Sequence, residues 1–179
     1  VQPYSDSPHD TENVSENIYM NIVERAKDYV YITTPYLILD DAMETSLKNA
    51  AKAGVDVRII TPHIPDKKLV FEATRASYMP LLKAGVKIYE YTPGFVHAKM
   101  FVSDDKIATV GTANLDYRSL FLHFECGALM YRSAAVSSVK ADFLETFKKC
   151  HRCSIAEMKR RSPFGKALAF VMKIIAPLL

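Results

Sequence analysis

The sequence predicts an α/β protein built on a mixed, mostly parallel sheet with helices on both faces, and three observations support this. A β-rich run that ends in Thr-Pro occurs three times, at 26–35, 53–62 and 84–93. Helix-like stretches separate these runs, and such alternation favours parallel strands joined by right-handed crossovers. After Gly94 the pattern changes, because two apolar runs follow each other with no room for a helix between them.

The elements expected along the chain follow from apolar spacing and from Gly and Pro positions. Between 40 and 54, Met43, Leu47 and Ala50 recur at helical spacing, and Gly54 fits the end of that helix. The expected helices are 11–28, 40–54, 66–85, a short one near 115–122, and 134–150. The expected strands are the three Thr-Pro runs, a hairpin of 96–102 with 107–111, and 124–131. All three Thr-Pro turns then fall at the carboxyl edge of the sheet, where ligands of open α/β sheets tend to bind.

Length and charge suggest one folded domain followed by a basic C-terminal segment. The 179 residues suffice for one domain with a sizeable core, which we expect to cover 1–150. From Lys148 onward there are eight Lys or Arg and one acidic residue, a net charge of +7, whereas the rest of the chain carries −4. We therefore expect 151–179 to be a basic and apolar segment that meets an anionic partner. No secretory signal pattern and no run of 18 apolar residues occur.

The three cysteines favour neither a metal site nor a disulfide framework. Cys150 and Cys153 form a single CxxC, with no second cluster to complete a zinc site. We expect reduced thiols and no metal.

The hairpin carries polar groups on a strand that otherwise looks buried. If Asp104-Asp105 is a two-residue turn, Lys99 faces Val110 and His97 faces Thr112 across the pair. A lysine on a half-buried strand is costly unless an anion neutralises it. Asn114 adds a side-chain N–H.

These groups together predict a phosphate pocket that contains a nucleophile. Backbone N–H groups at Gly111 and Thr112, and a helix beginning near Asn114, are expected to add positive potential. Imidazole can attack phosphorus when an acceptor fixes its other nitrogen, and Glu125 at the start of the next strand is the candidate for that role with His97. Asp104 is expected to hold the turn, since it lies too far from His97 to contact it.

The same residues resemble the HKD motif of the phospholipase D superfamily, H-x-K-x4-D-x6-G-S-x-N. The match comprises His97, Lys99, Asp104, Gly111, Thr112 and Asn114, with Thr in place of Ser as the one departure. The longer phrases "YVYITTPYLILDDAM", "GVDVRIITPHIPDKK" and "GTANLDYRSLFLHFE" are similar to bacterial cardiolipin synthases. Since members of that group carry two motifs after membrane-anchoring segments, this chain resembles the C-terminal half.

The resemblance implies a fold, a reaction and a set of roles. The fold is an α/β/α sandwich. The reaction is a phosphatidyl transfer through a phosphohistidine that condenses two phosphatidylglycerols to cardiolipin and glycerol, with no cofactor. In the implied site, His97, Lys99, Asp104 and Glu125 are catalytic-motif residues, and Lys99, Thr112 and Asn114 bind phosphate. Which half supplies the nucleophile is left open, and the full enzyme is expected at the bacterial cytoplasmic membrane.

Two histidines are required for this reaction, and the motif supplies one. The second is expected from the other half or from a second copy of the chain, although His63 is a further candidate at the carboxyl edge. Two alternatives remain: a dimeric phosphodiesterase or nuclease, and a silent half that docks and contacts membrane. The segment 165–176 is either an interfacial helix at a lipid surface or a helix packed on protein. Nucleic acid is not expected as a partner, because aromatic residues are not interleaved with the basic ones.

Overall fold

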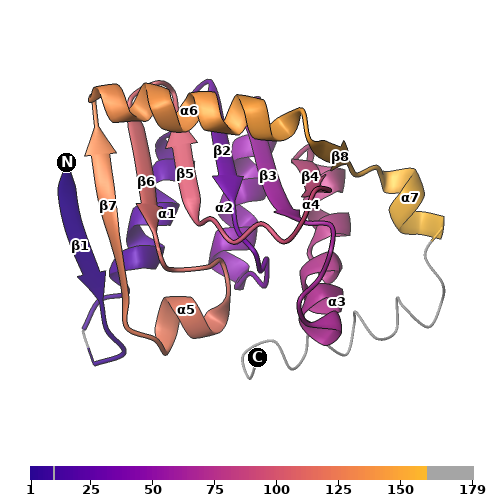
Figure 1. The fold of residues 1–179 in the computed structure, drawn as a ribbon, viewed down its shortest axis with the longest axis horizontal. Helices are drawn as coiled ribbons and strands as arrows, with labels where there is room; N and C mark the ends of the chain where they lie inside the picture. Colours follow the sequence, from indigo (N-terminus) through magenta and orange to yellow (C-terminus); the bar gives the residue numbers. More distant parts are fainter. Residues whose placement is uncertain (10, 161–179) are drawn as a thin grey trace.

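The computed structural model describes residues 1–9 and 11–160 and shows a single eight-stranded sheet covered by helices on both faces (Figure 1). The strands are β1 (Gln2–Asp6), β2 (Tyr29–Thr33), β3 (Asp56–Pro62), β4 (Lys87–Tyr91), β5 (Met100–Ser103), β6 (Ile107–Gly111), β7 (Glu125–Tyr131) and β8 (Cys150–Arg152). The helices are α1 (Val14–Arg25), α2 (Asp41–Lys52), α3 (Lys68–Ala76), α4 (Tyr78–Ala84), α5 (Tyr117–Phe121), α6 (Ala134–Phe147) and α7 (Ile155–Arg160).

The sheet is mixed, as expected, but parallel pairs are the minority. The strand order is β1-β7-β6-β5-β2-β3-β4-β8, and among the described residues only β2 with β3 and β3 with β4 run parallel. The expectation of a mixed sheet with helices on both faces was confirmed, but the expectation that most of its strand pairs are parallel was wrong. The cause is that β5, β6 and β7 all pair antiparallel, and β1 and β8, which the sequence pattern did not indicate, each add a further antiparallel strand at an edge.

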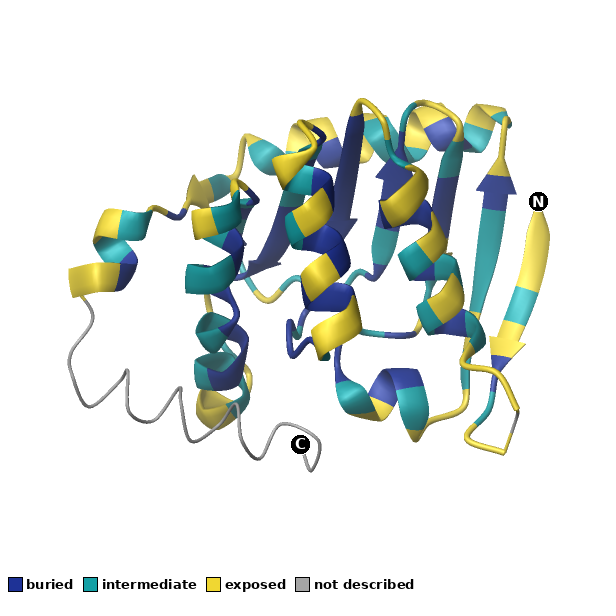
Figure 2. Cartoon of the chain, turned by 180° about the vertical axis from the view of Figure 1, so that it is seen from behind, coloured by how far each residue is buried: buried dark blue, intermediate teal, exposed yellow. Residues whose placement is uncertain are grey.

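Two layers of helices bury the two faces of the sheet, which confirms the sandwich. Helices α1, α2 and α4 pack on one face over a core that includes Tyr19, Leu47 and Ile59 (Figure 2). Helix α6 lies across the other face, where Phe143 packs with Tyr31 and other apolar residues. Because both faces are covered, the central strand β2 is buried at every position.

The stretch expected as one helix over 66–85 is two helices. Helix α3 ends at Ala76, and α4 begins at Tyr78 after Ser77. Pro80 explains the break, because proline is tolerated in the first turn of a helix but not in its interior. Gly85 ends α4 with a φ of 103°, which is the left-handed conformation that glycine adopts without strain.

The sheet continues past the expected domain boundary at residue 150. Strand β8 pairs with β4, where Tyr91 faces Cys150 and Glu90 faces His151, and α7 follows it. Residues 151–160 are thus part of the sandwich. The expectation for 165–176 lies outside the described residues. No helix within the described ranges is long and apolar enough to span a bilayer.

Candidate active site

Four of the motif residues, His97, Lys99, Thr112 and Asn114, lie at the end of the sheet where β2, β3 and β4 finish, whereas Asp104 lies at the other end. His97 and Lys99 lie in the β4–β5 loop, which crosses the carboxyl ends of β3 and β2 before β5 begins (Figure 1). Both were expected within a strand over 96–102, but β5 starts only at Met100. The loop leaves His97 exposed, whereas Lys99 is buried, with an exposed fraction of 8%.

The hairpin register differs from the expected one by a single residue. Met100 faces Val110 and Ser103 faces Ile107, so Lys99 lies opposite Gly111 rather than Val110. The reason is that Asp104 and Asp105 both adopt positive φ values, of 53° and 56°. The turn then includes a third residue before β6 begins.

His97 and Lys99 contact each other directly. The Lys99 Nζ lies 2.9 Å from His97 Nδ1 and 3.1 Å from Nε2, and it donates to the His97 carbonyl oxygen at 2.7 Å. Burial lowers the pKa of His97 below its ordinary value of 6.5, the Lys99 charge lowers it further, and the Asp66 charge opposes both. Burial also lowers the pKa of Lys99, against the charges of Glu125 and Asp116. Burial and the neighbouring ammonium thus both disfavour protonation of the imidazole.

Glu125 contacts a different motif residue from the one expected. The Thr112 hydroxyl donates to Glu125 Oε2, and the Cys126 backbone N–H donates to that hydroxyl at 2.9 Å. The other oxygen, Oε1, lies 3.8 Å from Nδ1 of His123. Among the described residues no hydrogen bond joins Glu125 to His97, so in this structure Glu125 positions Thr112 and not the imidazole.

Asn114 is held by two residues that the sequence analysis did not single out. Its Nδ2 donates to Asp116 Oδ2 at 3.1 Å and to Ser119 Oγ at 2.9 Å. Its Oδ1 is buried, and no hydrogen-bond partner for it is found in the described part of the chain. Both amide N–H groups are thus engaged within the protein. Asp116 also accepts from the Ser119 backbone N–H at 2.8 Å, which caps α5.

The backbone donors expected near Gly111 and Thr112 are also occupied. The Gly111 N–H bonds to the Lys99 carbonyl at 3.1 Å, and the Thr112 N–H bonds to the Cys126 carbonyl at 2.9 Å. The expectation that these groups cradle an anion was wrong, because both complete sheet pairing. Lys99 therefore provides the positive charge at the site.

Asp104 has the turn-holding role that its position suggested. Its carboxylate accepts backbone N–H groups from Lys27, Asp28 and Tyr29 at 2.8, 3.0 and 2.9 Å. Burial would raise the pKa of Asp104, but these three donors hold it below its ordinary value. Asp104 thus anchors the hairpin tip to the start of β2, at the opposite end of the strands from His97.

A small group of aromatic and acidic residues lies around His97. Tyr36 is expected from the sequence to face this edge, because it follows the first Thr-Pro turn, whereas Phe95 and Asp66 are not indicated by the sequence pattern. The rings of Phe95 and His97 lie 5.7 Å apart, and those of Tyr36 and Phe95 lie 6.4 Å apart. The Tyr36 hydroxyl donates to Asp66 Oδ2 at 2.5 Å. Tyr36 follows the end of β2, and Asp66 follows the end of β3. Their position at the carboxyl edge of the sheet is the signal by which both can be found.

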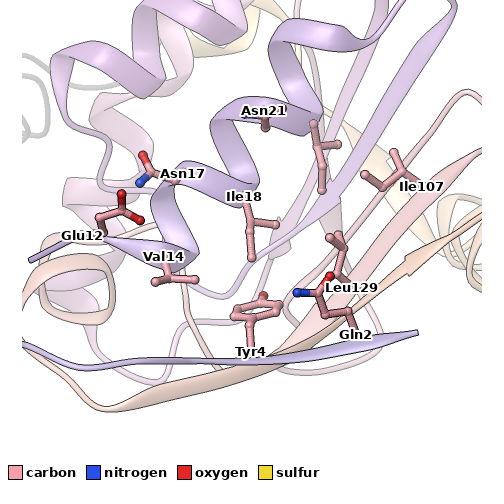
Figure 3. A pocket seen from close by; sticks show the side chains of 10 residues that line it. Gln2, Tyr4, Glu12, Val14, Asn17, Ile18, Asn21, Ile107 and Leu129 are labelled. Atoms are coloured by element: carbon pink, nitrogen blue, oxygen red, sulfur yellow. The ribbon is translucent and has the colours of Figure 1, made fainter. Parts of the chain in front are cut away.

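Cavities lie beside the site and also away from it. One of about 470 Å³ adjoins Asn114 and is lined by Tyr36, Lys67 and Arg118 among others. Another, of about 380 Å³, lies between β1 and α1, where Tyr4, Ile18 and Leu129 converge (Figure 3). The second cavity contains none of the motif residues, whereas the lining of the first includes Asn114 but neither His97 nor Lys99.

The remaining histidines and cysteines occupy separate places. His63 Nδ1 lies 2.7 Å from Glu90 Oε2, and His151 Nε2 lies 2.8 Å from Glu157 Oε1. Cys150 and Cys153 are free thiols, and burial raises their pKa values to about 11 and about 12. Within the described ranges no group of three or more His, Cys, Asp or Glu residues is arranged to hold a metal.

Comparison with known proteins shows the family to which the chain belongs. A family model described as "Cardiolipin synthase, PLD-like domain" matches residues 19–147. The chain is 54% identical over its whole length to an uncharacterized protein of Streptococcus mutans and spans 39% of it. It is 36% identical, again over its whole length, to a cardiolipin synthase of Halalkalibacterium halodurans and spans 36% of that protein.

A solved structure supports the fold independently of sequence. Phosphatidylserine synthase from Haemophilus influenzae superposes with a TM-score of 0.79 at 14% identity, covering 99% of this chain and 47% of that one. Identity this low is evidence for the fold alone. The family model, in contrast, matches more than half of the residues and includes His97 and Lys99. The chain therefore belongs to the family of cardiolipin synthase phospholipase D-like domains.

Proposed function

We propose that this chain is the second-motif half of a phosphatidyltransferase that condenses two phosphatidylglycerols to cardiolipin and glycerol. Family membership supports phosphatidyl transfer in general. The choice of phosphatidylglycerol as donor and acceptor rests on the resemblance to cardiolipin synthases, of which the chain spans about a third. The other half of the proposed enzyme would come from the rest of such a protein or from a second copy.

The observation that carries this proposal is the contact between the exposed His97 imidazole and the buried Lys99 ammonium. A lowered pKa keeps His97 neutral near pH 7, so a ring nitrogen can attack phosphorus or take a proton. The ammonium, in contrast, has lost most of its hydration, and a phosphate oxygen would replace it. A pair of this kind is suited to an anionic phosphodiester.

The proposed transfer has two steps that each need two imidazoles. In the first, one imidazole nitrogen forms a bond to phosphorus, the bond from phosphorus to the glycerol oxygen breaks, and the other imidazole protonates that oxygen. In the second, the same imidazole takes the proton from a hydroxyl of the second lipid, whose oxygen displaces the histidine from phosphorus. By analogy His97 is the acid and base of this pair.

The surface around His97 supports docking of another domain. Phe95, whose ring lies 5.7 Å from that of His97, is 36% exposed. An exposed large apolar side chain beside a polar site is compatible with an interface to protein or lipid. We further propose that the full enzyme acts at the cytoplasmic membrane, where its substrates reside, with anionic phospholipid as its ligand.

The test uses the enzyme in which this chain is joined to a first-motif half. His97→Ala should abolish conversion of labelled phosphatidylglycerol to cardiolipin while leaving the thermal unfolding midpoint unchanged. His151→Ala is the matched control, because His151 is exposed on β8 and bonds to Glu157. Full activity of His97→Ala would contradict the proposal.

The same preparations distinguish the alternatives. Cleavage of plasmid DNA without lipid transfer would favour the dimeric nuclease. Turnover of neither substrate, in a folded and rejoined enzyme, would favour a silent docking half.

A further inference from the structure

A second imidazole at the carboxyl edge is held by a buried ion pair. Glu90, on β4, is 2% exposed and receives three hydrogen bonds from Arg75 of α3, at 3.0 to 3.1 Å. His63, the first residue after β3, places Nδ1 2.7 Å from Glu90 Oε2. The His63 side chain nevertheless remains 47% exposed. The cluster thus combines a fully enclosed carboxylate with an accessible ring.

The ion pair determines which His63 nitrogen carries a proton. Glu90 accepts three hydrogen bonds from the Arg75 guanidinium, and a carboxylate in such a pair can only accept hydrogen bonds. Nδ1 of His63 must therefore donate, which leaves Nε2 of the neutral ring with a lone pair. No hydrogen bond to Nε2 is found among the described residues. Nε2 of His63 is therefore an exposed hydrogen-bond acceptor whose orientation is fixed by the bond to Glu90.

His63 lies on the same rim as the motif. Its backbone N–H pairs with the Tyr91 carbonyl at 3.0 Å, directly before the loop that carries His97. Three residues further along its own loop is Asp66, which receives the Tyr36 hydroxyl and whose charge acts on His97. The two histidines are therefore on neighbouring loops of one sheet edge.

A purely structural role does not require this histidine. The bidentate Arg75 already neutralises Glu90 and ties α3 to β4, so the burial of the carboxylate is compensated without an imidazole. His63 adds one hydrogen bond while leaving its other nitrogen open to solvent. A role in stabilising the fold does not account for the solvent-accessible Nε2 of His63.

We propose that His63 Nε2 accepts a hydrogen bond from a hydroxyl of the substrate headgroup, and so selects glycerol-type headgroups over ones that lack a hydroxyl. The identity of the headgroup rests on the proposed function. The inference concerns binding only, because the phosphoryl chemistry is assigned to His97 and its counterpart. Glu90 and Arg75 act as positioning residues, since they fix the His63 ring without contacting the headgroup.

The test follows the histidine ring signals of the ¹⁵N,¹³C-labelled chain by NMR near pH 8, well above the ordinary histidine pKa of about 6.5. The nitrogen shifts of His63 should show a protonated Nδ1 and an unprotonated Nε2. Glycerol 1-phosphate and propyl phosphate are then titrated in parallel, because they share the phosphate and differ in the two hydroxyls. Both should shift His97 signals, and only glycerol 1-phosphate should shift those of His63.

Variants give the second readout. His63→Leu should weaken binding of glycerol 1-phosphate by about 2- to 10-fold, as expected for one hydrogen bond, and leave propyl phosphate binding unchanged. His63→Gln keeps a hydrogen-bonding group and should restore part of the loss. A fold control is the set of His151 ring signals, which should stay at the same positions in both variants.

The outcomes separate this inference from the proposed function. Equal responses of His63 to both ligands, a protonated Nε2, or no effect of His63→Leu would overturn the inference while leaving the proposed function intact. A His63 response to glycerol 1-phosphate without any His97 response would support the inference and count against the proposed phosphate site. No response of either histidine would refute both.

Discussion

Replacing Asp104 by Asn tests whether this motif residue acts through the fold. Oδ1 accepts the N–H groups of Asp28 and Tyr29, and Oδ2 accepts that of Lys27. Asn would keep one oxygen but turn an N–H₂ group toward the third donor, and it would remove the charge from the other two bonds. Asn also tolerates the left-handed backbone at this position, so no strain is added.

The expected loss is moderate because the site is partly solvated. A hydrogen bond contributes about 0.5–1.5 kcal/mol to the free energy of unfolding, so one lost bond and two weakened ones give about 1–2 kcal/mol. For a chain of this size, that lowers the unfolding midpoint by about 2–8 °C. Guanidinium and thermal unfolding, followed by circular dichroism at neutral pH, measure both quantities.

The pH dependence supplies an independent check. The folded-state pKa of Asp104 lies below its ordinary value of 3.8, so its stabilisation is present above that pH and is lost as pH falls through the folded value. The wild-type and variant stabilities should therefore converge at acid pH. Asp105→Asn is the matched control, because Asp105 has a similar φ but a side chain that is 64% exposed and that accepts from the Tyr29 and Lys140 side chains rather than from backbone N–H groups. Equal effects of the two substitutions, or a difference that persists in acid, would refute the reasoning.

Two further predictions follow from other parts of the fold. Gly127→Ala should destabilise the chain by about 1–3 kcal/mol, because the added Cβ would clash with the Tyr4 side chain. Gly94→Ala is the control, since a Cβ at that position meets no atom within 4 Å. Thermal unfolding of both variants measures the difference. Lys99→Met should raise the pKa of His97, because the ammonium charge is one of the two influences that lower it. NMR titration of the His97 ring measures this pKa. An unchanged value would show that the Lys99 charge does not contribute to it.

The parts of the fold that sequence predicted are those with strong local signals. Thr-Pro endings placed β2, β3 and β4, and the motif spacing placed the hairpin. Edge strands were missed because each pairs on one side only, and β1 contains Pro3, which a central strand would exclude. The register of the hairpin depended on two consecutive left-handed aspartates, a backbone property that residue spacing does not specify.

The sequence predicted which of the motif residues lie together better than it predicted their individual contacts. His97 and Lys99 are adjacent because a two-residue spacing on one chain segment fixes their separation. Glu125 was assigned to the wrong motif residue, since the choice between His97 and Thr112 depends on how β7 pairs with β6 across a long loop. Tyr36 and Asp66 come from two other loops, and only the assembled sheet brings them to the imidazole.

The N-terminal strand has a consequence for how the domain can be prepared. The Tyr4 hydroxyl bonds to Thr109 on β6 at 3.0 Å, its ring covers Gly127, and Asp6 receives the Ser15 backbone N–H at 2.7 Å. A shortened version starting at residue 7 would leave the backbone of β7 open along its whole length and remove the acceptor from the first turn of α1. Because open strand edges recruit other chains, such a version should self-associate even though every motif residue is retained.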